Sequence, residues 1–83
     1  MRDPATGCVL VYNGELYNDA ELRTQLHQHQ FTTTNDTETV LAALAAWGPG
    51  ALARLRGMFA LGFYDPRDRS LLLARDTLGV KPL

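Results

Sequence analysis

The residues best suited to chemistry in this sequence are Asn13, Gly14 and Glu15, which directly follow an apolar segment at residues 8–12. An asparagine side-chain N–H beside a glycine backbone N–H is a pair of donors that suits an oxyanion, and one such donor is worth roughly 2.7–4 kcal/mol in a transition state. As a local pattern, however, Asn-Gly after a strand is the strongest short signal for a β-hairpin. Two alternatives stay open: a hairpin turn, or a strand-to-helix connection in which Gly14 approaches a ligand closely.

Asp36 and Glu38 form a second group, because both carboxylates lie in the first turn of a predicted helix. The helix dipole stabilises negative charge at that position by a few tenths to about 1 kcal/mol, and this is the ordinary structural reason for such a pair. The functional alternative is that Asp36 faces a pocket and binds the ammonium group of a substrate.

A third group is the charged set Arg75, Asp76 and Lys81, which lies in a segment with Gly and Pro at residues 74–83. A simple turn, an ion-pair cluster and a ligand-binding loop all remain open for this segment.

The cysteine and the two histidines are predicted to have no chemical role. Cys8 lies in an apolar strand, where a lone cysteine is usually a small core residue. His27 and His29 lie at a polar helix end among glutamines, without an evident acidic partner, and are expected on the solvated surface. One cysteine and two histidines make a poor metal set, so no metal site is expected.

Local signals place these groups on a short series of helices and strands. Asn18 and Asn35 are preferred N-cap residues, and each is followed three positions later by a glutamate, Glu21 or Glu38, as in a capping box. The predicted elements, in order, are a strand at 8–12, a helix capped at 18 that ends near 27–29 with Leu22 and Leu26 on one face, an extended piece at 31–34, a helix capped at 35 and stopped by Gly48-Pro49-Gly50, a short helix at 51–55, and strands at 58–64 and 71–74.

The last two strands are predicted to form an antiparallel hairpin around an Asp- and Pro-rich turn at residues 65–70. Both faces of this hairpin are apolar, which is typical of a sheet that is covered on both faces, with helices on at least one. The isolated chain is therefore expected to be poorly soluble, self-associated or only partly folded.

Composition limits the classes of function. With 83 residues, 46% hydrophobic content and a net charge of −1, the chain is predicted to be one small globular domain rather than a disordered tail. The eight Lys and Arg residues are scattered, so nucleic acid is not expected as a partner. No apolar run approaches the ~20 residues that span a bilayer, and the first residues do not form a signal peptide, so a cytoplasmic location without membrane contact is expected.

Five segments, in order and over nearly the whole length, resemble the class II glutamine amidotransferase domain of glutamine-dependent asparagine synthetases. Other class II relatives share some of these segments, but Trp-Gly and Gly-Met-Phe-Ala favour the synthetases. The matching segments are residues 11–18 ("NGEIYN" in the family), residues 35–38 ("sDTE"), Trp47-Gly48 ("WG"), residues 55–60 ("LrGMFA") and residues 74–83 ("ARDrlGiKPL").

This resemblance implies a fold and an activity. The fold class would be α+β, with residues 1–83 forming part of a four-layer αββα N-terminal-nucleophile-hydrolase sandwich with antiparallel sheets. The family hydrolyses glutamine to glutamate and ammonia with an N-terminal cysteine, whose α-amine is thought to serve as base. By resemblance, the Asn13 side chain and the Gly14 backbone would form the oxyanion hole. Glu15 and Asp36 would hold the amino-acid end of glutamine, with Asp36 on the ammonium.

The resemblance also implies partners outside this sequence. Ammonia would pass to a synthetase domain that amidates aspartate with ATP and Mg, so no cofactor is expected within residues 1–83. Glutamine and that domain are the expected partners, together with a homodimer of the full-length protein.

The sequence departs from the family at both ends. No cysteine follows Met1, the amine of Cys8 is in a peptide bond, and Met1 aligns with the internal methionine of the family's "QPM". The early "RHRGPD" segment, whose arginine binds the glutamine carboxylate, has no counterpart, and the family continues beyond Leu83. We therefore expect a domain truncated at both ends and inactive alone. The alternative is a non-catalytic binding or scaffold domain of an asparagine-synthetase-like protein.

Overall fold

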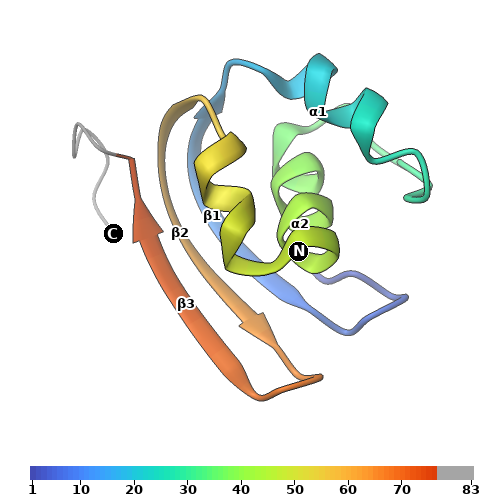
Figure 1. The fold of residues 1–83 in the computed structure, drawn as a ribbon, viewed down its shortest axis with the longest axis vertical. Coiled ribbons are helices and arrows are strands. Elements are labelled where there is room, and N and C mark those ends of the chain that lie inside the picture. Colours follow the sequence, from blue (N-terminus) through green and yellow to red (C-terminus); the bar gives the residue numbers. More distant parts are fainter. Residues whose placement is uncertain (77–83) are drawn as a thin grey trace.

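The computed structural model describes residues 1–76 of the chain. It confirms the predicted order of strand, helix, helix, strand and strand, with a 3-10 helix in place of the short helix expected at 51–55 (Figure 1). Residues 77–83, which belong to the predicted final loop and to the last family-like segment, lie outside the described residues. The elements are β1 (Val9–Leu16), α1 (Asp19–Gln25), α2 (Asp36–Trp47), the 3-10 helix η1 (Gly48–Arg54), β2 (Gly57–Asp65) and β3 (Ser70–Arg75).

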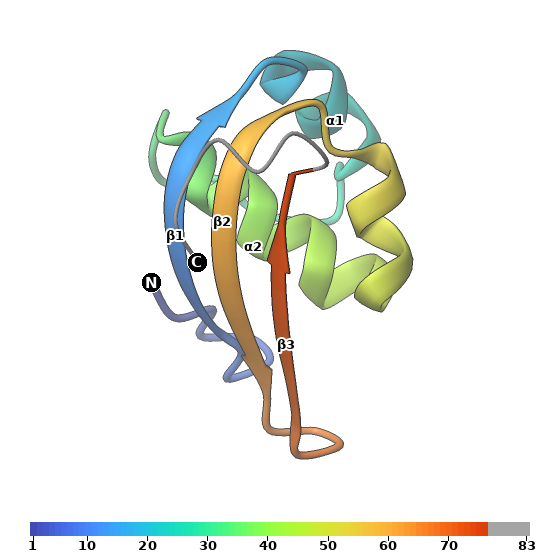
Figure 2. The same ribbon diagram turned by 90° about the vertical axis from the view of Figure 1, so that its left-hand side faces the viewer.

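The three strands form one antiparallel sheet in the order β1-β2-β3, with β2 in the centre. The sheet is curved, and α1, α2 and η1 all lie on its concave side (Figures 1 and 2). The described chain therefore consists of one helical layer on one sheet. This arrangement confirms the α+β class and the antiparallel sheet.

The core lies between α2 and the concave face of the sheet. Alternate residues of β1 and β2, such as Leu10 and Phe63, point into it and pair across the strands. Helix α2 contributes an unbroken buried stretch, residues 38–44, and Leu22 and Leu26 are buried as predicted. Helix α2 is therefore covered on most sides by the rest of the chain.

No helix of the described chain covers the convex face of the sheet (Figure 2). This face carries exposed apolar side chains. Val11 is 73% exposed and Leu71 is 67% exposed. The prediction of a hairpin that is apolar on both faces is therefore confirmed: its concave face forms part of the core, whereas several apolar side chains of its convex face are exposed. The large apolar residues exposed on this face are Val9, Val11, Tyr64, Leu71 and Leu73.

The two N-cap asparagines behave differently. Asn35 caps α2 as predicted, because its side chain accepts a hydrogen bond of 2.9 Å from Thr37 N. Asn18 occupies the N-cap position of α1, but its side chain donates to Arg54 O and accepts from Arg56 N instead. The predicted capping box at α1 is therefore wrong, because the asparagine side chain joins α1 to the η1–β2 junction.

The segment at residues 31–34 is not the extended piece that was predicted but part of the irregular loop between α1 and α2. The carboxylate of Glu38 binds the backbone of this loop rather than the N-cap of its own helix. The predicted capping box at α2 is therefore also wrong in its second half.

Candidate functional site

Asn13, Gly14 and Glu15 lie inside β1 rather than after it. They pair with Ala60, Phe59 and Met58 of β2, respectively. Both local structures expected for this segment, the hairpin turn and the strand-to-helix connection, are therefore wrong. The strand continues to Leu16 because its partner β2 comes from much later in the chain and supplies the pairing that no local segment could.

Gly14 is required by the close approach of the two strands. Its φ of +155° is disfavoured for residues with a side chain, and a Cβ there would lie 2.6 Å from Phe59 Cα and overlap the carbonyl oxygen of Met58. A Cβ on Gly57 would overlap the carbonyl oxygen of Glu15 in the same way. Glycines on both strands thus shape the backbone of the segment that carries the predicted oxyanion donors.

The side chains of this segment alternate between the two faces of the sheet. Asn13 and Glu15 are exposed on the convex face, whereas Tyr12 lies on the concave face. Arg75 of β3 shares the convex face, because it pairs with Ala60, which pairs with Asn13. An amide, a carboxylate and a guanidinium group therefore occupy the same polar end of the convex face.

Asp36 is connected to this segment from the helical side. It is the first residue of α2, and its Oδ2 accepts a hydrogen bond of 2.9 Å from Leu16 N, at the end of β1. The structure thus brings the four predicted site residues to one end of β1, three within the strand and one bonded to its last residue. Asn13 and Glu15 nevertheless present their side chains to the opposite face of the sheet from α2.

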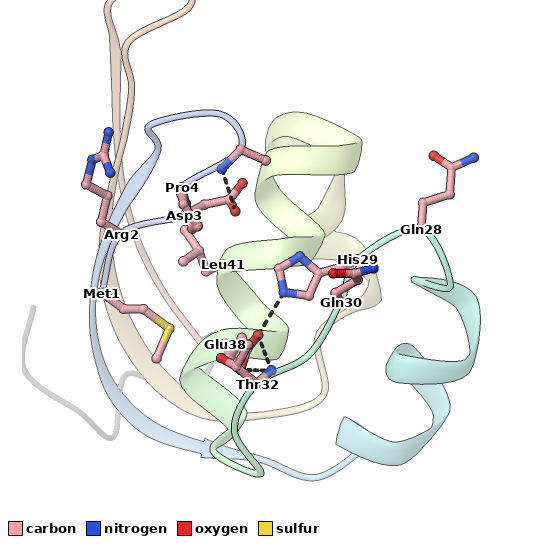
Figure 3. A pocket seen from close by; sticks show the side chains of 11 residues that line it. Met1, Arg2, Asp3, Pro4, Gln28, His29, Gln30, Thr32, Glu38 and Leu41 are labelled. Carbon is pink, nitrogen blue, oxygen red and sulfur yellow. Dashed lines mark hydrogen bonds and ion pairs between the residues drawn. The ribbon is translucent and has the colours of Figure 1, made fainter.

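None of the four predicted residues lines the two hollows described next. One hollow, of about 470 Å³, lies between residues 1–5 and the loop before α2, and includes His29 and Glu38 (Figure 3). Another, of about 650 Å³, lies between η1 and the ends of β2 and β3. The four residues therefore form an open surface on the described chain rather than an enclosed pocket.

Tyr12 is a buried polar residue next to the predicted site, and sequence reasoning missed it. Its ring stacks on Phe59 at 6.5 Å between centroids, and its hydroxyl is buried without a hydrogen-bond partner among residues 1–76. Burial, together with the nearby carboxylates of Asp36 and Glu15, raises the pKa of Tyr12 above its ordinary value. Tyr12 is thus a neutral O–H donor near Asp36. Extending the strand pattern to Leu16 would have placed it on the core face, where a tyrosine hydroxyl usually needs a partner.

The interaction between His29 and Glu38 was also missed, and the prediction of a solvated His29 is wrong. Its Nε2 lies 2.8 Å from Glu38 Oε2 (Figure 3). Its ring packs edge-on against Phe31, with 4.5 Å between the ring centroids. Burial disfavours the charged form of Glu38, but hydrogen bonds from His29, Thr33 and Thr32 outweigh it and lower its pKa to about 2. The partner lies nine positions away, on another element, so no local pattern reveals it.

Asp76 belongs to the third predicted group and is buried beside the larger hollow. Its backbone N–H donates to Phe59 O at 3.0 Å, but neither carboxylate oxygen has a hydrogen-bond partner within the described chain. Arg75 is exposed and lines the same hollow. Lys81, the third member of the group, lies outside the described residues, so a ligand-binding role for this group stays a prediction.

Cys8 is fully buried, as predicted for a core residue. Desolvation raises the pKa of its thiol above the ordinary value. A buried thiol with a raised pKa forms little thiolate and is a poor nucleophile.

No group of three or more His, Cys, Asp or Glu side chains within residues 1–76 is arranged to hold a metal ion. No helix in the same range is long and apolar enough to cross a membrane.

Comparison with known proteins identifies relatives of this chain. A Mycobacterium tuberculosis (strain H37Rv) protein that carries the name asparagine synthetase (glutamine-hydrolysing) is 50% identical over 78 residues. Asparagine synthetase (glutamine-hydrolysing) 3 of Bacillus subtilis is 44% identical over 75 residues, or 88% of this chain. In both cases the match spans only 12% of the relative's length.

A solved structure confirms the fold. Glutamine phosphoribosylpyrophosphate amidotransferase from B. subtilis superposes on 99% of this chain with a TM-score of 0.74, at 24% sequence identity and over 20% of its own length. This likeness agrees with the predicted N-terminal-nucleophile-hydrolase architecture. The sequence profile of the family described as the glutamine amidotransferase domain matches residues 1–83. The chain belongs to the glutamine amidotransferase family.

Proposed function

We propose that this chain is the part of a glutaminase domain that holds glutamine, in a glutamine-dependent asparagine synthetase. The observation that carries the proposal is the hydrogen bond from Leu16 N to Asp36 Oδ2. It ties the predicted ammonium-binding carboxylate to the strand that holds the predicted oxyanion donors. Asp36 therefore acts as one unit with the consecutive residues Asn13, Gly14 and Glu15, although it lies 20 positions after Leu16 in the sequence.

Each residue has a role in this proposal. Asp36 accepts the α-ammonium of glutamine with the carboxylate oxygen that Leu16 does not occupy, and Glu15 supports the amino-acid end. The Asn13 side chain and the Gly14 N–H donate to the oxygen of the glutamine side-chain amide, where negative charge develops when a nucleophile attacks the carbonyl carbon. The convex face, on which Asn13 and Glu15 are exposed, is where the side chain of glutamine would lie.

Cys8 does not suit the role of nucleophile, because its thiol is buried and its pKa is raised. We propose that these 83 residues bind glutamine without hydrolysing it. In the complete reaction, ammonia would amidate aspartate in a synthetase domain that binds ATP and Mg, within a cytoplasmic homodimer.

The second candidate is a non-catalytic binding or scaffold domain. The unreactive setting of Cys8 and the open arrangement of the four site residues favour it. The two candidates differ in whether glutamine is recognised, and this difference can be measured directly.

The experiment is calorimetric titration of the chain with L-glutamine, beside an assay for released ammonia. We expect saturable binding, no ammonia, and affinity at least about tenfold lower for Asp36→Asn, because a charge-assisted hydrogen bond is worth about 1.5–3 kcal/mol. Asp68→Asn is the matched control, because Asp68 lies in the β2–β3 turn, where its side chain accepts a hydrogen bond from Ser70 N. Absence of binding, or equal binding by Asp36→Asn, would support the scaffold alternative.

A further inference from the structure

The carboxylate of Glu38 is used to hold the loop that leads into α2. It accepts hydrogen bonds from Thr32 N at 3.0 Å, Thr33 N at 2.8 Å and Thr33 Oγ1 at 2.8 Å. His29 Nε2 donates to the same carboxylate at 2.8 Å (Figure 3). Glu38 is only 5% exposed, so these hydrogen bonds take the place of those that its carboxylate would make to water.

Arg23 of α1 holds the same loop from the other side. Its Nη1 donates to Thr33 O and its Nη2 to Asn35 O, both at 2.9 Å. The guanidinium is oriented by Asp19, at 3.2 Å, and Asp19 also accepts a hydrogen bond from Thr39 Oγ1 of α2. Glu38 thus binds N–H groups of the loop while Arg23 binds its carbonyls, which leaves the loop little freedom to shift along the helix axis.

The loop ends directly at the predicted ammonium-binding residue. Asn35 caps α2, and Asp36 follows it with its Oδ2 on Leu16 N. A change in the path of residues 32–35 would rotate or displace the first turn of α2 and with it the Asp36 carboxylate. Glu38 is therefore connected to Asp36 and β1 by its hydrogen bonds to Thr32 and Thr33, by the backbone of residues 33–36, and by the hydrogen bond from Leu16 N to Asp36.

We propose that Glu38 is a positioning residue that sets the Asp36 carboxylate for the α-ammonium group of glutamine. This inference rests on the proposed function and extends it to a residue that does not touch the substrate.

An ordinary helix cap would not account for the arrangement. A glutamate at the third helical position usually turns back to the N-cap N–H and remains near the surface. Glu21 occupies the same position in α1, where it is exposed. Glu38 instead is buried and has four hydrogen-bond donors from outside its own helix. Glu21 therefore provides a matched control at an equivalent helical position.

The test compares two ligands on the full chain, L-glutamine and its analogue that lacks the α-amino group, 4-carbamoylbutanoate. Glu38→Gln keeps the size of the side chain but places an NH₂ group against N–H donors. We expect it to lower the affinity for L-glutamine about tenfold or more and to leave the affinity for the analogue unchanged, because only the ammonium contact depends on Asp36. In an Asp36→Asn background, Glu38→Gln should cause no further loss of affinity for L-glutamine. The control variant Glu21→Gln should bind both ligands as the wild type does.

Equal loss of affinity for both ligands would overturn the inference, because it would show a general structural role for Glu38. A wild-type chain that binds neither ligand would overturn the proposed function. In that case amide hydrogen exchange at Leu16 still tests whether Glu38 positions Asp36, because Leu16 N donates to Asp36 Oδ2. Faster exchange of this amide in Glu38→Gln than in Glu21→Gln supports that role of Glu38, and unchanged exchange contradicts it.

Discussion

At the scale of single residues, Gly14 has the strictest requirement in the site. Its positive φ and the contact between β1 and β2 leave no room for a Cβ. We expect Gly14→Ala to lower the free energy of unfolding by roughly 2 kcal/mol or more, because the strands must separate to accept the methyl group. Chemical denaturation followed by circular dichroism measures this change.

The matched control is Gly50→Ala, because Gly50 has open space around its Cβ position and lies in η1. We expect it to change the free energy of unfolding by less than about 1 kcal/mol. Equal stabilities for the two variants would show that β1 and β2 are not packed as closely at Gly14 as described.

The hydrogen bonds of Glu38 should make the free energy of unfolding depend on pH. The pKa of Glu38 is lowered from 4.5 to about 2 in the folded chain. The carboxylate therefore contributes stability that is fully present above pH 4.5 and is lost as the pH falls towards 2. The difference in unfolding free energy between wild type and Glu38→Gln should shrink over that interval. A difference that stays constant from pH 7 to 2 would mean that the four donors do not stabilise the charged form.

At the scale of elements, the two N-cap asparagines predict opposite responses to one substitution. Serine is as good an N-cap as asparagine but has a shorter side chain. At position 35 it can still accept from Thr37 N, so Asn35→Ser should leave the melting temperature nearly unchanged. At position 18 it cannot reach both Arg54 O and Arg56 N, so Asn18→Ser should cost about 1–2 kcal/mol. Thermal unfolding of both variants measures the contrast, and equal melting temperatures would refute it.

The same elements show what local patterns could and could not predict. The capped and glycine-terminated helix α2 and the hairpin of β2 and β3 follow from signals within a few residues, and both were predicted correctly. Asn13-Gly14 was misplaced because a local turn signal competes there with pairing to β2, which is distant in the sequence. The same limit applies to the candidate site. The residue types at Asn13, Glu15 and Asp36 were visible in the sequence, but the bond from Leu16 to Asp36 and the loop held by Glu38 depend on packing between elements.

At the scale of the whole molecule, the exposed convex face of the sheet governs behaviour in solution. Val11 and Leu73 flank Gly62 on this face and are both largely exposed. We expect the wild-type chain to self-associate with increasing concentration, because contiguous apolar surface favours association. The double variant Val11→Thr/Leu73→Thr should remain more monomeric in sedimentation velocity. Leu72→Thr on the concave side should instead lower stability. A wild-type chain that stays monomeric and unfolds in one sharp transition would contradict this expectation.

The account as a whole depends on glutamine binding at the end of β1. The most direct measurement is a titration of the ¹⁵N-labelled chain with L-glutamine, followed in amide correlation spectra. We predict saturable shifts at the amides of residues 13–16 and of Asp36, and their loss in Asp36→Asn. Spectra that do not change, or changes confined to the hollow around His29, would contradict the assignment of these residues to a glutamine site.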